Sequence, residues 1–482
     1  MLKNLFDIDQ YFKKLFYTLL FINIFFFLNI YDYPWIGDDY SLIFKPKLYN
    51  LLNNNFFIFD YNYLENRFVP LYSIFYQILP ANFTLYHLIV VLTHFFSSLI
   101  IFQILRELNF EKKICFLSSI LYSIHYSIHA KTLIWIAFWG HTLNAFTGFI
   151  SIYLFLIYLR NKKKRFLISS VLISTIGILV MESGAIYPII NFILIFFFRN
   201  KSPKILVLTL FPLIFYFMLS LSANNSAYTF YLERLDSNFK NIDARFDENK
   251  ISSKSENILY LYRSTYAPRD LKGYSLRAFD NFLMSLNLSS LENILQSTDN
   301  RNQIKLIIKE YLLLFTLIFF LFFSMLLYLV FKRLKILFGS KQFKTFLLLY
   351  IVVFIIYTVV FFRKDFSVSL SFCTATIVSL IYNHLERKKN TYLSKIILIL
   401  FIFPSILFFS YNFNFLSETG YKKSYQNIFL KYNENLKDKF DFNTSVYDKN
   451  FKYFYFYNNF KKEKNFLKIL KGKSYREFEE IF

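Results

Sequence analysis

Residues 83–105, FTLYHLIVVLTHFFSSLIIFQIL, decide the fold class of this chain. These 23 residues contain no Asp, Glu, Lys or Arg, and a helix of ~20 apolar residues is long enough to cross a bilayer. The apolar residues are continuous rather than alternating, which favours a helix over a membrane β-strand. This stretch therefore predicts a membrane-spanning helix.

Similar apolar stretches recur along the chain. Of its 482 residues, 55% are hydrophobic and 22% aromatic, with only nine Gly and nine Pro. A soluble domain could not shield so many long apolar stretches from water, so the composition predicts an all-α polytopic membrane protein. We expect about eleven transmembrane helices. The predicted spans are 15–30, 83–105, 114–129, 133–159, 166–180, 185–198, 205–222, 306–331, 346–362, 367–382 and 396–411.

Clusters of Lys and Arg fall on every second loop between the predicted spans, as in RNKKKR at 160–165. Because cytoplasmic loops carry an excess of these residues, the pattern predicts a cytoplasmic N-terminus and an external C-terminus. Residues 1–411 are then a transmembrane domain with external loops at 31–82 and 223–305. Residues 412–482 are expected to form an external tail or a small module.

The net charge of +23 comes from 55 Lys and Arg against 32 Asp and Glu. Since most cationic clusters lie in the loops, we interpret them as topology determinants that also favour anionic lipid, and we expect no nucleic-acid partner. Cys115 and Cys373 fall inside predicted spans, so no disulfide framework is implied. The first apolar segment lacks a small-residue cleavage site and is interpreted as a retained signal anchor.

The most distinctive polar feature is Asp38-Asp39, in YPWIGDDY at 33–40, just beyond the first predicted span. An external carboxylate beside a membrane can act as a general base toward a hydroxyl, or hold a divalent cation. Successive side chains point in different directions, so the two residues are not expected to share one task. Their repulsion would raise the pKa of one carboxyl unless a cation or hydrogen bonds compensate. The alternative interpretation is an exposed acidic turn after Gly37.

Further polar residues follow at the ends of, or inside, predicted spans. Ionisable residues within spans are costly, so they usually face a cavity or a partner. The residues concerned are Arg67, His87, His94, His125, His129, Lys131 and Glu182, with Trp135 beside them.

This series resembles the C-type (GT-C) glycosyltransferase superfamily, the multi-span enzymes that use polyprenyl-phosphate sugars. It is most similar to the protein O-mannosyltransferase-like branch. The resemblance covers roughly residues 15–200, with weaker agreement near Arg363 and Tyr382. The matching stretches are Asp38-Asp39 for the acidic pair, RFVPL at 67–71, HLIVVLTH at 87–94, HAKTLIWI at 129–136 and MESGAIYP at 181–188.

The resemblance implies a GT-C type architecture and transfer of a sugar to an acceptor hydroxyl with inversion. Asp38 would be the general base, and Asp39 would orient the acceptor or hold a divalent cation, Mg²⁺ or Mn²⁺. Polyprenyl phosphate leaves without prior protonation, so one base plus cations around the phosphate would suffice. The expected partners are the lipid-linked sugar, an acceptor glycan, lipid or protein, and the bilayer itself.

The sequence departs from the family pattern at two cationic positions. Lys131 stands where that branch has Glu, and Met181 stands where it has Lys. The donor phosphate would then be bound by Lys131, Arg67, Arg263 or Arg363. Arg67 is equally consistent with an interfacial snorkelling arginine.

The remaining candidates have weaker signals. Glu182 would contact or support the sugar, or else be a loop carboxylate at the membrane surface. His87 and His94 lie on one helical face without an evident third metal ligand. We therefore assign His87, His94 and His129 to packing or cavity lining. Trp135 would line the cavity or act as an interfacial anchor.

Two other classes of protein remain open. A lipid-linked oligosaccharide polymerase or ligase would also have many spans and a large external loop, but would not need the acidic pair. A transporter or flippase would need broken helices and buried charges at the bilayer midplane. The bias toward Lys, Asn, Ile and Phe suggests an AT-rich bacterial genome. We therefore expect a multi-pass protein of the bacterial cytoplasmic membrane with its active site on the external, periplasmic face.

Overall fold

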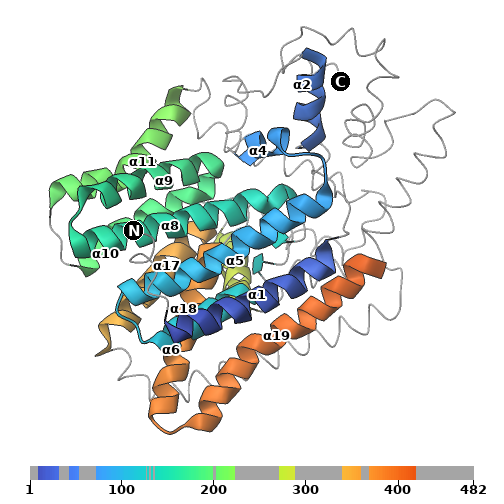
Figure 1. Cartoon of the computed structure of the whole chain (residues 1–482). Helices are drawn as coiled ribbons and strands as arrows, with labels where there is room; N and C mark the ends of the chain where they lie inside the picture. The colour runs from blue at the N-terminus through green and yellow to red at the C-terminus, as the bar shows by residue number, and fades with distance from the viewer. Residues whose placement is uncertain are drawn as a thin grey trace.

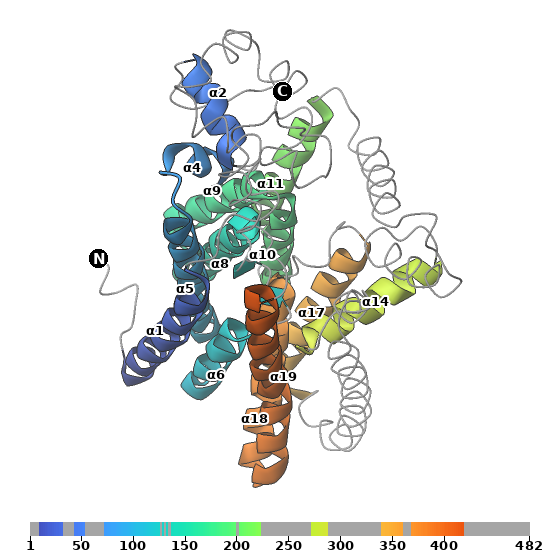
Figure 2. The same cartoon turned by 90° about the vertical axis from the view of Figure 1, so that its right-hand side faces the viewer.

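The computed structural model describes part of the chain, and its regular structure there is entirely helical, without a strand. Figures 1 and 2 show these helices as a bundle seen in two views. The described residues are 9–31, 43–53, 72–125, 128–129, 132–133, 136–198, 202–222, 271–287, 339–359 and 368–418.

Five of the described helices are long and apolar enough to cross a membrane, judged by length and composition. They are α1 (Gln10–Ile30), α5 (Phe83–Glu107), α8 (Trp139–Asn161), α17 (Lys341–Val359) and α18 (Val368–Arg387). The prediction of an all-α chain with membrane-spanning segments is confirmed at this level. The number of about eleven and the GT-C arrangement stay predictions.

The other apolar helices also coincide with predicted spans, and span 306–331 lies outside the described residues. These helices are α6 (Lys112–Ser123), α9 (Lys164–Val180), α10 (Ile186–Phe197), α11 (Pro203–Ser222) and α19 (Thr391–Glu418).

The boundary between the third and fourth predicted spans is wrong. A helix was expected over 114–129, but α6 ends at Ser123, and α8 begins at Trp139 after the short 3₁₀ helix η3 (Ile136–Phe138). Buried polar groups from other helices replace the helical hydrogen bonds that are missing at this break. Because these groups are distant in sequence, the hydropathy of the region does not reveal the break. His94 Nε2, for example, lies 3.0 Å from the Ser123 carbonyl.

Packing centres on α5 and α18. Helix α5 contacts α1, α6 and α8, while α18 contacts α6, α17 and α19. Helices α8 and α9 approach closely because Ser151 and Ser170 exchange hydroxyl-to-carbonyl hydrogen bonds of 3.0 and 2.8 Å. Asn191 of α10 donates to the Ser151 hydroxyl at 3.1 Å. Small and polar side chains thus bring three helices together, as is common between membrane helices.

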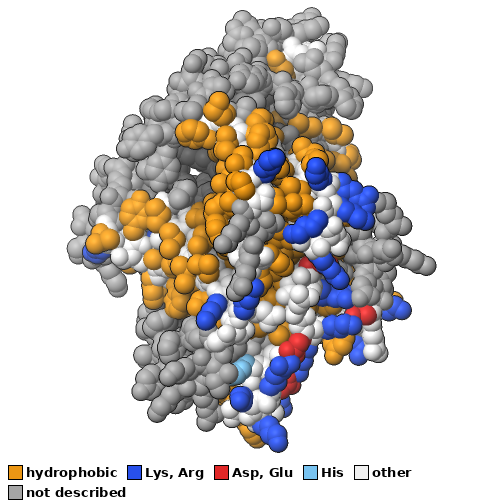
Figure 3. Space-filling model, turned by 90° about the vertical axis from the view of Figure 1, so that its left-hand side faces the viewer, with side chains coloured by type: hydrophobic (Ala, Val, Ile, Leu, Met, Phe, Trp, Pro, Cys, Tyr) orange, Lys and Arg blue, Asp and Glu red, His pale blue; other side chains and the backbone are white. Residues whose placement is uncertain are grey.

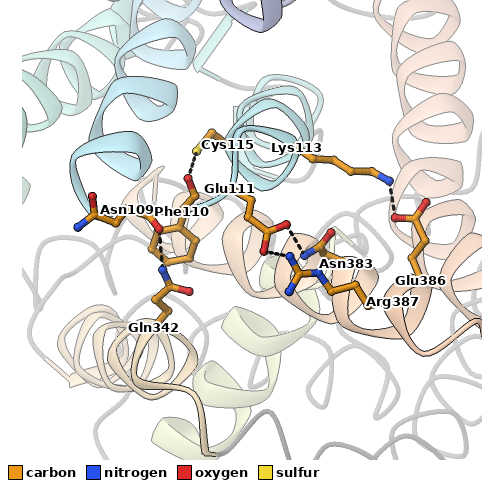
Figure 4. Close-up of polar contacts among 9 residues, drawn as sticks. All are labelled: Asn109, Phe110, Glu111, Lys113, Cys115, Gln342, Asn383, Glu386 and Arg387. Carbon is orange, nitrogen blue, oxygen red and sulfur yellow. Dashed lines mark hydrogen bonds and ion pairs between the residues drawn. The ribbon is translucent and has the colours of Figure 1, made fainter.

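One end of the bundle is held by ion pairs between helix ends. Asp9 pairs with Lys112 at 2.6 Å, and Glu107 pairs with Arg160 at 3.4 Å. Figure 4 shows two further pairs joining α6 to α18, Lys113 with Glu386 and Glu111 with Arg387. On the face in Figure 3, acidic side chains lie beside Lys and Arg, and hydrophobic side chains dominate above them.

At this ion-paired end lie the helix ends that border the loops predicted to be cytoplasmic. The N-terminal ends of α1, α6 and α17 meet the C-terminal ends of α5, α8 and α18 there, with Gln342 donating to the Asn109 carbonyl at 3.0 Å. The alternation of the helices therefore agrees with the predicted loop order, while the side of the membrane stays a prediction.

The opposite end carries two short helices from the predicted first external loop, α2 (Lys45–Asn53) and α4 (Tyr72–Ile78) (Figure 2). Thr84, at the start of α5, donates to the carbonyl of Tyr31 at the end of α1 at 3.0 Å. Tyr86 donates to the Tyr76 carbonyl at 3.1 Å, and Tyr76 donates to the Ile136 carbonyl at 2.6 Å. These bonds fasten α4 to α5 and η3.

Candidate functional site

Three of the predicted site residues have described side chains: His87, His94 and His129. Glu182 is described only through its backbone, in the 3₁₀ helix η4 (Glu182–Ala185). The others, Asp38, Asp39, Arg67, Lys131, Trp135, Arg263 and Arg363, lie outside the described residues.

The acidic pair lies in 32–42, outside the described residues, but the residues on both sides of this segment are described. The segment follows Tyr31, whose carbonyl accepts the Thr84 hydrogen bond. It precedes Ile43 and Phe44, whose side chains are fully buried. Both flanking stretches belong to the end of the bundle that carries α2 and α4. The segment that carries Asp38 and Asp39 therefore starts and finishes away from the ion-paired end.

Lys47 of α2 is a buried cation that the sequence reasoning did not single out. Its side chain is 6% exposed, and its Nζ donates to the carbonyls of Gln77, at 3.1 Å, and Leu79 at the end of α4. Burial lowers the pKa of Lys47 to about 8. A short KPK stretch at 45–47 is the only signal in the sequence. Lys47 joins α2 to the exposed carbonyl end of α4, as a cation does at a helix C-terminus.

A second buried cation, Arg277, also escaped the sequence reasoning. It lies on α14 (Leu271–Ser285), within the predicted external loop 223–305, and is 1% exposed. Asp280 and Asn281 on the same helix are fully buried, and Asn281 donates to the Thr358 hydroxyl of α17 at 3.2 Å. Their polarity made this stretch read as a surface segment, whereas the helix packs against α17.

The MESGAIYP motif forms a packed break between α9 and α10. Asn144 of α8 donates to the Ser183 hydroxyl at 2.8 Å and to the Met181 carbonyl at 3.4 Å. A Cβ on Gly184 would lie 2.6 Å from the carbonyl oxygen of Gly177, so the backbone of η4 touches the end of α9. The missed residue here is Asn144, which holds the break closed.

Three buried histidines, His94, His125 and His129, gather halfway along the bundle. They are 0–2% exposed, and the ring centres of His94 and His129 are 4.5 Å apart. The His125 and His129 ring centres are 6.3 Å apart. The ring of Tyr122 lies 4.7 Å from that of His129 and stacks on His94 at 5.5 Å. We call His94, His125 and His129 the histidine cluster.

The histidine cluster joins the C-terminal ends of two helices. His94 Nε2 contacts the carbonyl of Ser123, the last residue of α6, and His125 Nε2 lies 3.1 Å from the carbonyl of Ser285, the last residue of α14. The Ser285 hydroxyl also lies 2.9 Å from that of Tyr350, in the middle of α17. Both α6 and α14 thus end inside the bundle rather than at its surface.

The sequence predicts packing or cavity lining for His87, His94 and His129. The structure brings His94 and His129 into ring contact, and His87 is fully buried about two turns earlier on α5. His125, noted in the sequence only as a residue at a span end, completes the cluster. Its spacing of four residues from His129 was the available signal. Within the described ranges, no group of three or more His, Cys, Asp or Glu is arranged to hold a metal ion.

Comparison of the chain with protein-family models finds no matching family. Comparisons with curated proteins and with solved structures find no match either. The GT-C resemblance therefore stays a prediction that rests on the quoted motifs.

Proposed function

We propose that this chain is a membrane glycosyltransferase that moves a sugar from a polyprenyl-phosphate donor to an acceptor hydroxyl, with inversion. One observation carries the proposal. The described residues that flank the segment carrying Asp38-Asp39, which are Tyr31 on one side and Ile43 and Phe44 on the other, belong to the end of the bundle opposite the ion pairs. This arrangement suits an external site reached by a lipid-linked donor.

The chemistry needs one base and several cations. Asp38 takes the proton of the acceptor hydroxyl, whose oxygen bonds to the anomeric carbon as the bond from that carbon to the phosphate oxygen breaks. The electron pair leaves with the phosphate anion, which Arg67, Lys131, Arg263 or Arg363 stabilises. Asp39 orients the acceptor or holds Mg²⁺ or Mn²⁺. Lys47 supports the loop by fastening α2 to α4.

Separate Asp38→Asn and Asp39→Asn variants test this proposal. At equal membrane abundance, Asp38→Asn should lower sugar transfer from purified polyprenyl-phosphate donors by about 10²–10⁴-fold, as expected for loss of a general base. Asp39→Asn should have a smaller effect, and chelation of divalent ions separates its two proposed roles. Asp9→Asn, an identical change at the ion-paired end, is the matched control and should keep full activity. Full activity in both loop variants would remove the pair from the mechanism.

A second candidate function, a transporter or flippase, is favoured by the histidine cluster. Such proteins have helices that end near the bilayer midplane beside polar groups, as α6 and α14 end here at His94 and His125. One preparation of the protein in vesicles distinguishes the two functions. A transporter reconstituted in vesicles would move solute equally well with Asp38→Asn and would form no glycosidic bond.

A further inference from the structure

We propose that the histidine cluster binds a single proton, shared between imidazole rings in the interior of the bundle. The inference does not rest on the proposed sugar transfer. It follows from three buried imidazole rings, each of which uses its Nε2 atom for a contact with the protein. The ligand is a proton from bulk water, and the ring that accepts it becomes an imidazolium.

The hydrogen bonds assign the tautomer of each neutral ring. A carbonyl oxygen only accepts, so His94 Nε2, facing Ser123, and His125 Nε2, facing Ser285, must carry their hydrogens. Ser371 already donates its hydroxyl hydrogen to the Val368 carbonyl at 2.6 Å. His129 Nε2, 3.3 Å from that hydroxyl oxygen, is therefore also the donor. The Nδ1 atom of each neutral ring therefore carries no hydrogen and has a free lone pair.

These three Nδ1 lone pairs are buried and have no hydrogen-bond partner in the part of the chain that the structure describes. Buried acceptors of this kind are costly unless a donor reaches them. A proton held between the neighbouring His94 and His129 rings supplies one hydrogen to two such acceptors. The centres of these two rings lie 4.5 Å apart and the rings are tilted by 60°, so the rings are in direct contact.

Carbonyl groups at two helix ends would offset part of the cost of burying one positive charge. Helix C-termini carry partial negative charge, and the ends of α6 and α14 both point at the cluster through the Ser123 and Ser285 carbonyls. The elements packed around it carry further titratable groups, among them Tyr122 on α6, Arg277 and Asp280 on α14, Tyr350 and Tyr357 on α17, and Cys373 on α18.

A second proton is excluded by repulsion. Two charges at the ring separation seen here would repel strongly in a protein interior, so a second proton should bind at least about 100-fold more weakly than the first. A metal ion is the less suitable occupant, since the described His, Cys, Asp and Glu residues form no metal-holding group.

The test is ¹⁵N NMR of the full-length, histidine-labelled protein in lipid nanodiscs, titrated from pH 8 to pH 4. Imidazole ¹⁵N shifts report tautomer and protonation directly. We expect Nε2-protonated neutral rings for all three residues at pH 8, then uptake of one proton by the cluster with signals shared between His94 and His129. His94→Gln and His129→Gln should each abolish the shared signal. His141→Gln, another buried histidine, is the matched control and should preserve it.

Three results would overturn the proposal. The first is that all three rings stay neutral over the whole range in which the protein remains folded. The second is that the rings titrate independently, each taking its own proton. The third is a stoichiometric transition metal that copurifies and whose removal changes the same three signals.

Discussion

Lys47 is the residue whose chemistry depends most clearly on its surroundings. Lys47 is 6% exposed, and its ammonium donates to the backbone carbonyls of Gln77 and Leu79. Among the residues that the structure describes, no carboxylate pairs with this ammonium, and burial lowers the pKa of Lys47 from 10.5 to about 8. The folded protein therefore favours the neutral amine more than the unfolded chain does.

This shift predicts a pH-dependent stability. Below about pH 8 the folded protein bears the full cost of a buried ammonium, and this cost is relieved as the pH rises from the folded pKa toward 10.5. Relative to Lys47→Met, the wild-type protein should gain about 2 kcal/mol between about pH 7 and pH 10. Thermal unfolding in detergent across this range measures the difference.

The matched control is Lys163→Met, which removes an exposed lysine at the other end of the bundle. Its stability should follow that of the wild-type protein at every pH. A wild-type curve parallel to that of Lys47→Met would contradict the buried-ammonium account.

At the scale of elements, α8 and α10 pack through one glycine. A Cβ on Gly148 would lie 2.3 Å from the ring of Tyr187, which is 3% exposed and also packs edge-on against Phe149 at 5.8 Å. The ring occupies the space that any other side chain would need. Gly177 of α9 differs, since the nearest atom to its added Cβ would be the Thr147 hydroxyl oxygen at 3.0 Å, followed by the Asn144 side-chain oxygen at 3.7 Å.

We therefore predict that Gly148→Ala destabilises the protein. Overpacking a rigid ring in a close-packed interior costs about 1–3 kcal/mol, which exceeds the gain of about 1 kcal/mol from replacing a helical glycine. Gly177→Ala is the control and should be close to neutral. Thermal unfolding of both variants in detergent gives the comparison. The double variant Gly148→Ala with Tyr187→Leu should recover part of the loss, and a failure to do so would argue against the ring contact.

Individual helices also show where sequence patterns were insufficient to predict the structure. Helix ends at 180 and 222 agree with the predicted spans because hydropathy changes there. The end of α6 at Ser123 was missed because the carbonyl of Ser123 is satisfied by His94, a contact between distant residues that no local pattern records. Helix α14 was missed for a different reason: Arg277 and Asp280 read as surface residues, yet both are buried.

At the scale of the whole molecule, the bundle has two chemically different ends. Ion pairs such as Asp9 with Lys112 hold one end, and α2 and α4 cover the other. Exposed ion pairs contribute little stability individually, about 0–1 kcal/mol each. Their position agrees with the predicted order of the loops, and the side of the membrane on which they lie stays a prediction.

Cysteine labelling in intact cells tests this sidedness. A membrane-impermeant maleimide should label Leu51→Cys on α2, where the native side chain is 42% exposed. Lys163→Cys, in the loop after α8, should react only after permeabilisation. The native Cys115 and Cys373 are fully buried and should stay unlabelled in the wild-type control. Labelling of both variants from the same side would reject the topology.

The sequence by itself determined the class of the protein, most helix positions and the order of the loops, because continuous apolar segments and clustered Lys and Arg are local properties. It also singled out Asp38-Asp39, whose environment stays a prediction. Only the tertiary structure decided that α6 and α14 end inside the bundle and that His94, His125 and His129 meet there. The reason is physical: those contacts join residues up to 160 positions apart, and no local pattern records which distant carbonyl a buried imidazole will bind.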